Sequence, residues 1–190
     1  MDIVDLEELR SIYAAPRERA LKKQLSRLDR HCRGFVALSP FVVVASCGAS
    51  GAMDASPRGG APGFVKVVDE STLLMPDDPG NNRLDTLENI LKTPQVGLLF
   101  LVPGVDETLR VNGSAVLSRR ESFLDLCTTE RRRPRLVVAV TVREAYVHCA
   151  KALMRSALWH PDSRIDRSRL PTMGEMLAEQ TASDGPVETQ

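Results

Sequence analysis

Short apolar runs rich in β-branched residues recur along the chain between residues 41 and 149, and this pattern constrains the fold more than any other feature. Such runs are typical of β-strands. Four of them come first: FVVVASC (41–47), FVKVVD (64–69), STLLMP (71–76) and VGLLFLV (96–102). The first run is apolar throughout, so we expect a strand that is buried on both faces.

Two later segments alternate between apolar and polar residues, as a strand with one buried face does. In TLRVNGSAVL (108–117), the apolar residues share one face and Arg110 lies on the other, polar face, which we expect to line a site. In RLVVAVTVREAYVHC (135–149), the alternation slips by one residue near Glu144. This slip predicts a β-bulge at Glu144.

Helical patterns flank the strands and lie between them. In the first forty residues, Leu21, Leu25 and Leu28 follow one another at the spacing of one helix face. Shorter helices are expected at 83–91, 122–130 and 150–159. About six antiparallel strands with so few helical crossovers favour a small β-barrel over a doubly wound sheet. The expected fold class is therefore mainly β, with flanking helices.

The chain divides into three parts on this interpretation. Residues 1–38 form an N-terminal helical extension, residues 39–160 form the barrel domain, and residues 161–190 form a C-terminal extension. The last ten residues are polar and contain glycine and proline, so we expect them to be disordered.

The composition excludes several classes of protein. Lysine plus arginine and aspartate plus glutamate number 25 each, so a formal net charge of zero gives no support for binding nucleic acid or an anionic membrane. Four widely spaced cysteines and three histidines favour reduced thiols and no metal site. No Gly-x-Gly-x-x-Gly and no Walker-type lysine loop is present. Without the pattern of a signal peptide or an apolar span, we expect a cytoplasmic protein.

The segment DASPRGG (54–60) is the first candidate binding site. It places Ser56 and Arg58 beside two glycines, and Asp54 opens it. A glycine-rich loop lets the backbone approach a ligand closely, and an arginine binds a phosphate through two parallel hydrogen bonds. Taken alone, this segment is better explained as a plain hairpin turn.

The segment PGNNRLDTLENIL (79–91) is the second candidate. It is a turn that leads into a helix whose expected apolar face is Leu84, Leu87 and Leu91. Asn81 or Asn82 is expected to cap that helix. Free N–H groups at a helix start, together with Arg83, would form an anion site. The alternative is an ordinary capped helix with a solvent-exposed arginine.

The expected helix at 150–159 adds a third element. Lys151, Arg155 and Trp159 are spaced four residues apart and share one stripe. Two cations next to the only tryptophan would suit an anionic, aromatic ligand. The opposite stripe is expected to pack on the barrel and holds Leu153, Met154 and Ala157.

Taken in order, these segments resemble the pyridoxamine 5′-phosphate oxidase-related flavoproteins, in the subgroup that binds FMN. The resemblance covers roughly residues 30–160. It rests on six motifs: DASPRG (54–59), GFVKV (63–67), PGNNRLD (79–85), VGLLF (96–100), LRVNG (109–113) and HCAKALMRS (148–156). The C-terminal stretch WHPDSRIDRSRLP (159–171) has no counterpart of the segment with which the true vitamin B6 enzymes hold their substrate. The resemblance therefore does not extend to oxidation of vitamin B6.

The resemblance implies a split β-barrel that forms a homodimer, with FMN bound at the subunit interface. It implies that the first two candidate segments hold the FMN phosphate and ribityl chain. Arg110 and the stripe at 151–159 are candidates for contacts from the neighbouring subunit or around the flavin ring. The implied cofactor-binding residues are Asp54, Ser56, Arg58, Asn81, Asn82, Arg83, Arg110, Lys151, Arg155 and Trp159.

The expected function is that of an FMN-dependent oxidoreductase that acts on an unknown small molecule through flavin N5. No catalytic residue is assigned. The alternative is a flavin-binding protein without turnover, which serves stress, storage or sensing. Binding of haem or of the deazaflavin F420, which occurs elsewhere in the superfamily, is a third possibility.

Overall fold

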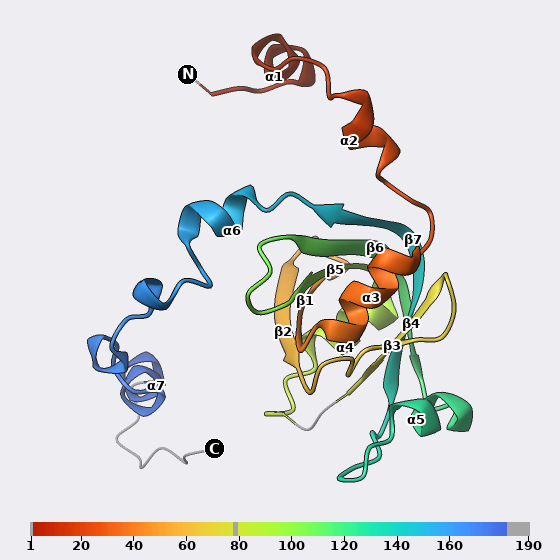
Figure 1. The fold of residues 1–190 in the computed structure, drawn as a ribbon. Helices are drawn as coiled ribbons and strands as arrows, with labels where there is room; N and C mark the ends of the chain where they lie inside the picture. The colour runs from red at the N-terminus through yellow and green to blue at the C-terminus, as the bar shows by residue number, and fades with distance from the viewer. Residues whose placement is uncertain (1, 78–79, 182–190) are drawn as a thin grey trace.

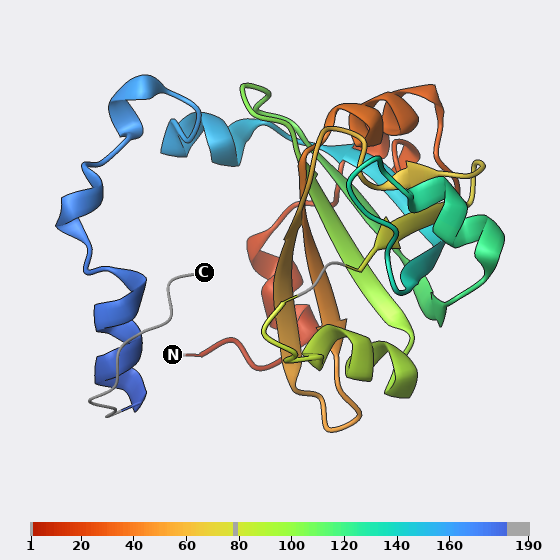
Figure 2. The same ribbon diagram turned by 90° about the horizontal axis from the view of Figure 1, so that it is seen from below.

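The computed structural model describes residues 2–77 and 80–181. Its centre is one antiparallel sheet of seven strands in the order β2-β1-β5-β6-β7-β4-β3, which curls around a single core (Figures 1 and 2). The strands are β1 (Phe41–Cys47), β2 (Met53–Gly59), β3 (Lys66–Val67), β4 (Thr72–Pro76), β5 (Gln95–Leu101), β6 (Thr108–Ser118) and β7 (Val137–His148). The mainly β fold class is confirmed, with one strand more than the sequence suggested.

The predicted bulge is confirmed. Strands β6 and β7 stay in register until Asn112 pairs with Glu144, and the next pair is Gly113 with Val142, so Arg143 is the extra residue. A Cβ atom at Gly113 would lie 2.1 Å from the carbonyl oxygen of Thr141. Only glycine fits this close approach between the two strands.

Strand β1 differs from the prediction in its burial. Val42, Val44 and Ser46 are fully buried, whereas Val43 and Ala45 on the other face are half-buried and Phe41 is exposed. Strand β5 repeats this pattern. The single chain therefore covers one face of a segment whose sequence is apolar on both faces.

Two helices close the core. Helix α3 (Arg30–Leu38) buries Cys32 and Val36, and α4 (Asp85–Lys92) buries Leu87 and Ile90, all in the same cluster as the strands. The expected apolar face of α4 was therefore wrong in two of its members, because Leu84 and Leu91 are exposed. A shorter helix, α5 (Glu121–Cys127), packs on β4 and β7 from outside the barrel.

The N-terminal helices are shorter than the leucine spacing suggested. Helices α1 (Leu6–Ile12) and α2 (Glu18–Lys22) bury no residue. At Leu25 the chain is no longer helical, and Leu25 forms an antiparallel bridge with Ala145 of β7. Leu28 is fully buried in the barrel core ahead of α3. Leu25 and Leu28 therefore contact the barrel and do not form one face of a helix.

After β7 the chain leaves the barrel as an arm (Figure 1). It contains α6 (Lys151–Ser156), two single 3-10 turns (Pro161–Ser163 and Arg167–Arg169) and α7 (Met173–Thr181). Apart from Thr181, the last ten residues, which were predicted to be disordered, lie outside the described residues. In the part of the chain that the structure describes, no helix is both long and apolar enough to cross a membrane.

Candidate functional site

The segment DASPRGG is not a loop as predicted. Residues 53–59 form β2, an edge strand that pairs with β1 along its whole length. Asp54, Ser56 and Arg58 alternate with exposed neighbours, so the three side chains point to one side. Pro57 has no N–H to donate, but an edge strand tolerates this. The proline and glycines of this segment suggested a turn. They obscured the alternation of inward and outward side chains that is typical of a strand.

The turn GNNR stands next to β2 but does not cap α4 as predicted. The Asn81 side chain accepts a hydrogen bond from the backbone N–H of Arg83 (3.0 Å), which folds the turn. Asn82 has a φ of 62°, in the left-handed region that asparagine tolerates better than most residues. The N-cap of α4 is Leu84, without a side-chain cap. The asparagines therefore shape the turn and leave the helix start uncapped.

A buried chain of hydrogen bonds stands behind Arg58. The hydroxyl of Thr86, on the first turn of α4, donates to the Asp54 carboxylate (2.6 Å) and accepts from Arg58 Nη2 (3.4 Å). Ser46 donates to the same carboxylate (3.4 Å) and accepts from Asn89 (3.0 Å). Thr86 and Ser46 are almost fully buried. In the single chain, Asp54 thus holds Thr86 and Ser46, and through Thr86 it orients Arg58.

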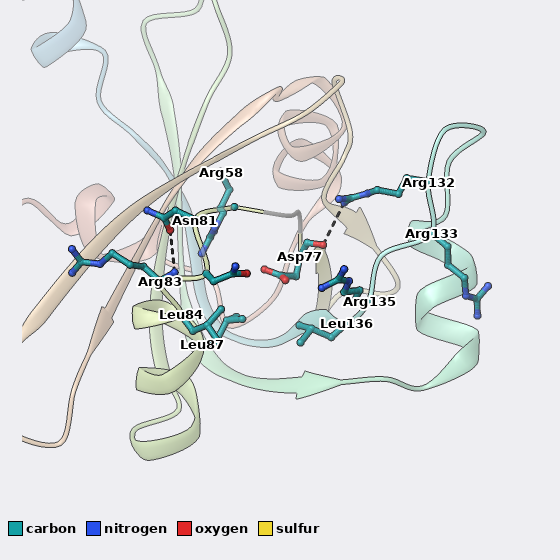
Figure 3. A pocket seen from close by; sticks show the side chains of 12 residues that line it. Arg58, Asp77, Asn81, Arg83, Leu84, Leu87, Arg132, Arg133, Arg135 and Leu136 are labelled. Carbon is teal, nitrogen blue, oxygen red and sulfur yellow. Dashed lines mark hydrogen bonds between the residues drawn. The ribbon is translucent and has the colours of Figure 1, made fainter. Parts of the chain in front are cut away.

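Arg58 reaches into a cavity of about 760 Å³, the largest feature of its kind near the predicted residues (Figure 3). One side is formed by Arg58 and the turn at 80–83, and the other by the loop before β7. Leu84, Leu87 and Leu136 form an apolar floor. The described residues that line it are Arg58, Asp77, Gly80, Asn81, Asn82, Arg83, Leu84, Leu87, Arg132, Arg133, Arg135 and Leu136.

The loop before β7 supplies arginines that the sequence analysis missed. Arg133 bonds to Glu121 and Asp125 of α5, which ties the loop to that helix, and it points away from the cavity in Figure 3. Arg132 donates to the backbone oxygen of Asp77 (3.3 Å), and Arg135 points toward the cavity. The run RRRPR (131–135) was the available signal. The sequence alone does not indicate that this loop contacts the end of β4.

A second, smaller pocket of about 230 Å³ adjoins the first. It shares Arg58, Asn81 and Arg83 with the large cavity and adds Asp54, Ser56, Asp85 and Thr86. Two arginines there face two carboxylates. In the large cavity Arg83 and Arg133 are paired with carboxylates outside it, and Arg58, Arg132 and Arg135 remain beside Asp77, the one carboxylate among the described lining residues. An anion is therefore favoured on the side of the large cavity.

Arg83 contributes less to the large cavity than the resemblance implies. Its Nε lies 2.9 Å from the Asp85 carboxylate, and its side chain is 76% exposed. Figure 3 shows its guanidinium directed away from the cavity. A charge that is already paired and solvated adds little to the binding of an anion.

Arg110 belongs to a different cluster. It donates to the Tyr146 hydroxyl (2.9 Å), and the Lys23 ammonium lies over the same ring, 5.2 Å from its centroid. Burial lowers the pKa of His148, and the charges of Arg110 and Lys23 lower it further. Neither described pocket that is lined by Arg58 includes Arg110.

Lys151, Arg155 and Trp159 lie in the arm, apart from the cavity of their own chain (Figure 1). The two cations are exposed, and the Trp159 indole N–H donates to the backbone oxygen of Val105 (2.9 Å). Met154 is 62% exposed and Ala157 is exposed too, so the predicted packing of that stripe on the barrel was wrong for these two residues.

A family model described as pyridoxamine 5′-phosphate oxidase matches residues 28–149. HupZ from Group A Streptococcus is similar in structure, with a TM-score of 0.52 and 15% identity over 63% of this chain and 92% of that chain. An FMN-binding protein from Syntrophomonas wolfei subsp. wolfei has a TM-score of 0.47 and 10% identity over 73% and 95%. No curated protein sequence matches the chain. The likeness to HupZ shows a shared fold.

Proposed function

The chain belongs to the pyridoxamine 5′-phosphate oxidase family, and from this premise we propose that it binds FMN in the arginine-lined cavity and acts as an oxidoreductase on a small molecule. The family match covers more than half of the 190 residues and includes the cavity. The single observation that carries the proposal is the cavity itself, which combines clustered arginines with an apolar floor.

The residues of the cavity suit the parts of FMN. A phosphate near neutral pH is close to doubly charged and forms its strongest hydrogen bonds with arginines. Arg58 is held in place by Thr86 and Asp54, so it would bind the phosphate without reorganising. Leu84, Leu87 and Leu136 offer an apolar surface for a ring. Asn82 would supply a neutral hydrogen bond beside Arg58, as would Ser56 from the smaller, adjoining pocket.

When bound, FMN accepts a hydride or electrons at N5 and passes them to a second molecule. The chain's own residues would bind the cofactor, orient it and limit the access of water. Arg135 and Arg132, from the opposite side, are further candidates for contacts with the cofactor or with an anionic substrate. No side chain of the cavity is assigned as an acid or a base.

We further propose that two copies form a homodimer through the outer face of β1 and β5. On that face Val43, Leu99 and Leu101 are only half-buried, and Phe41 is exposed, although the sequence is apolar there. An apolar sheet face of this kind favours association. In the dimer, Lys151, Arg155, Trp159 and Arg110 would complete the FMN site of the neighbouring copy.

The enzyme is distinguished from a flavin-binding protein without turnover by repeated reduction. We expect NADH or NADPH to bleach the bound flavin and oxygen to restore the yellow colour over many cycles. Bleaching by dithionite alone would favour the protein without turnover. A colourless preparation that does not take up FMN would refute both.

The dimer has its own measurement. Light scattering at micromolar concentration should give twice the chain mass of 20.9 kDa. A monomer that retains stoichiometric flavin would refute an interfacial site while leaving the cavity proposal intact.

A further inference from the structure

Among the described residues that line the large cavity, Asp77 is the one carboxylate. It follows directly on the last residue of β4, and its backbone is fixed from both sides. Its N–H donates to the backbone oxygen of Leu136 (3.1 Å), and its own backbone oxygen accepts from Arg132 Nη2 (3.3 Å). The position of the side chain is therefore set by the barrel and by the arginine loop together.

The carboxylate itself points into the cavity, toward the side that Arg58 forms (Figure 3). Within residues 2–77 and 80–181, no hydrogen bond and no salt bridge engages its oxygens, although five arginines line the same cavity. Among the described residues, this acceptor is therefore unpaired in a cavity that Arg58 and Arg135 also line. A ligand that fills the cavity meets this carboxylate as well as the arginines.

An ionised carboxylate only accepts hydrogen bonds, so it binds more tightly a ligand that places hydroxyl or N–H donors beside it. It repels a phosphate at the same place, and this repulsion is stronger in a partly enclosed site than in water. A repulsive group that acts against one ligand and an attractive group that acts for another together produce specificity.

We propose that Asp77 is a specificity-determining residue that makes the cavity accept a monophosphate carrying hydroxyl or N–H donors and reject a pyrophosphate. This inference rests on the proposed binding of FMN, whose ribityl hydroxyls and ring N–H are such donors. Under this assignment the arginines select for negative charge, and Asp77 limits where that charge lies. FMN then binds in preference to FAD.

The test compares ligands in the full-length chain with and without the charge at position 77. Asp77→Asn keeps the shape of the side chain and removes its charge. Dissociation constants for FMN, FAD and inorganic pyrophosphate are measured by calorimetry. We expect Asp77→Asn to narrow the preference for FMN over FAD roughly tenfold and to tighten pyrophosphate binding by a similar factor.

Glu130→Gln is the matched control, because it removes one negative charge from the exposed start of the same arginine loop without lining the cavity. It should leave the FAD-to-FMN ratio unchanged. Asp77→Ser serves as a second variant, and thermal unfolding verifies that each variant is folded. In a chain that binds FMN, an unchanged ratio of FAD to FMN affinity in both Asp77 variants would overturn the inference, as would an equal change in Glu130→Gln.

The two proposals fail separately. If the wild-type chain binds no flavin, the proposed function is wrong, and pyrophosphate binding then decides the role of Asp77 alone. Tighter pyrophosphate binding in both Asp77 variants would support that role, and no change would refute it. If the wild-type chain binds FMN and both Asp77 variants keep its preference, only the present inference is overturned.

Discussion

The two sides of the large cavity are built in different ways. On one side, Arg58 projects from a paired strand and contacts Thr86, which is buried and bonded to Asp54. On the other side, Arg132 and Arg135 project from a loop that is tied to α5 by the surface ion pairs of Arg133. The first side is fixed by buried groups. The second is held by these ion pairs, which water and salt weaken, and also by the buried Pro134 and the hydrogen bond from Arg132 to the Asp77 backbone oxygen.

This difference indicates a division of roles. A side chain that is already held in its binding conformation loses little entropy when a ligand arrives, so Arg58 should contribute most to phosphate affinity. The Arg135 side chain is exposed, so it can adapt to ligands of different shape. The second side therefore suits the more variable part of a ligand or a second, anionic molecule.

Arg58→Ala should produce the largest loss. We expect FMN binding to weaken by about 1.5–3 kcal/mol, the usual contribution of a hydrogen bond to a charged group. Calorimetry with FMN measures it, and Arg119→Ala, an exposed arginine that neither pocket includes, is the control. Equal losses in the two variants would mean that the phosphate lies elsewhere.

Arg135→Ala tests the second side of the cavity. Because Arg135 is exposed, we expect a loss of about 0.5–1.5 kcal/mol that shrinks as salt is raised from 0.05 to about 0.5 M. Arg131→Ala, in the same loop but outside the large cavity, should change little. A loss that exceeds that of Arg58→Ala would reverse the comparison between the two sides.

Thr86→Val removes the hydroxyl that connects Asp54 with Arg58 and nearly conserves the volume. We expect FMN affinity to fall by about 0.5–1 kcal/mol and the free energy of unfolding by about 1–2 kcal/mol, because Asp54 loses its closest donor. Thr86→Ser keeps the hydroxyl and should retain most of both. If Thr86→Val is destabilised but binds FMN normally, the buried chain supports the fold and does not orient Arg58.

Arg83→Ala should have the smallest effect, below about 0.5 kcal/mol on FMN binding, because Arg83 is already paired with Asp85 and exposed. A titration beside Arg58→Ala gives the comparison directly. A loss as large as that of Arg58→Ala would show that Arg83 turns toward the ligand when FMN binds.

Much of the fold was predictable because most of its strands show a local pattern of apolar residues. The apolar runs identify β1, β4 and β5, and the phase slip at Glu144 locates the bulge opposite Gly113. Strand β2 was not predicted, because Pro57 and Gly59 are typical of turns. A strand tolerates them here because β2 lies at the edge of the sheet. Leu25 pairs with Ala145 and Leu28 bonds to the backbone of Glu70, and local spacing does not reveal contacts so distant in the sequence.

The candidate site was predictable in part, for the same reason. Arg58 and Arg83 stand in recognisable segments, and the structure does place both beside one cavity. The pairing of Arg83 with Asp85, the role of Thr86 and the approach of the arginine loop to Asp77 depend on long-range packing. Sequence patterns indicate which residue types are present, whereas the folded chain decides which of them share a cavity.

The central claim is that the arginines of this cavity hold the phosphate of FMN, and a comparison of FMN with riboflavin tests it most directly. Both ligands carry the same ring and ribityl chain, so the ratio of their dissociation constants isolates the phosphate. We predict that the wild-type chain binds FMN at least about tenfold more tightly than riboflavin, and that Arg58→Ala removes most of this preference. Equal affinity of the wild-type chain for FMN and riboflavin would contradict the account.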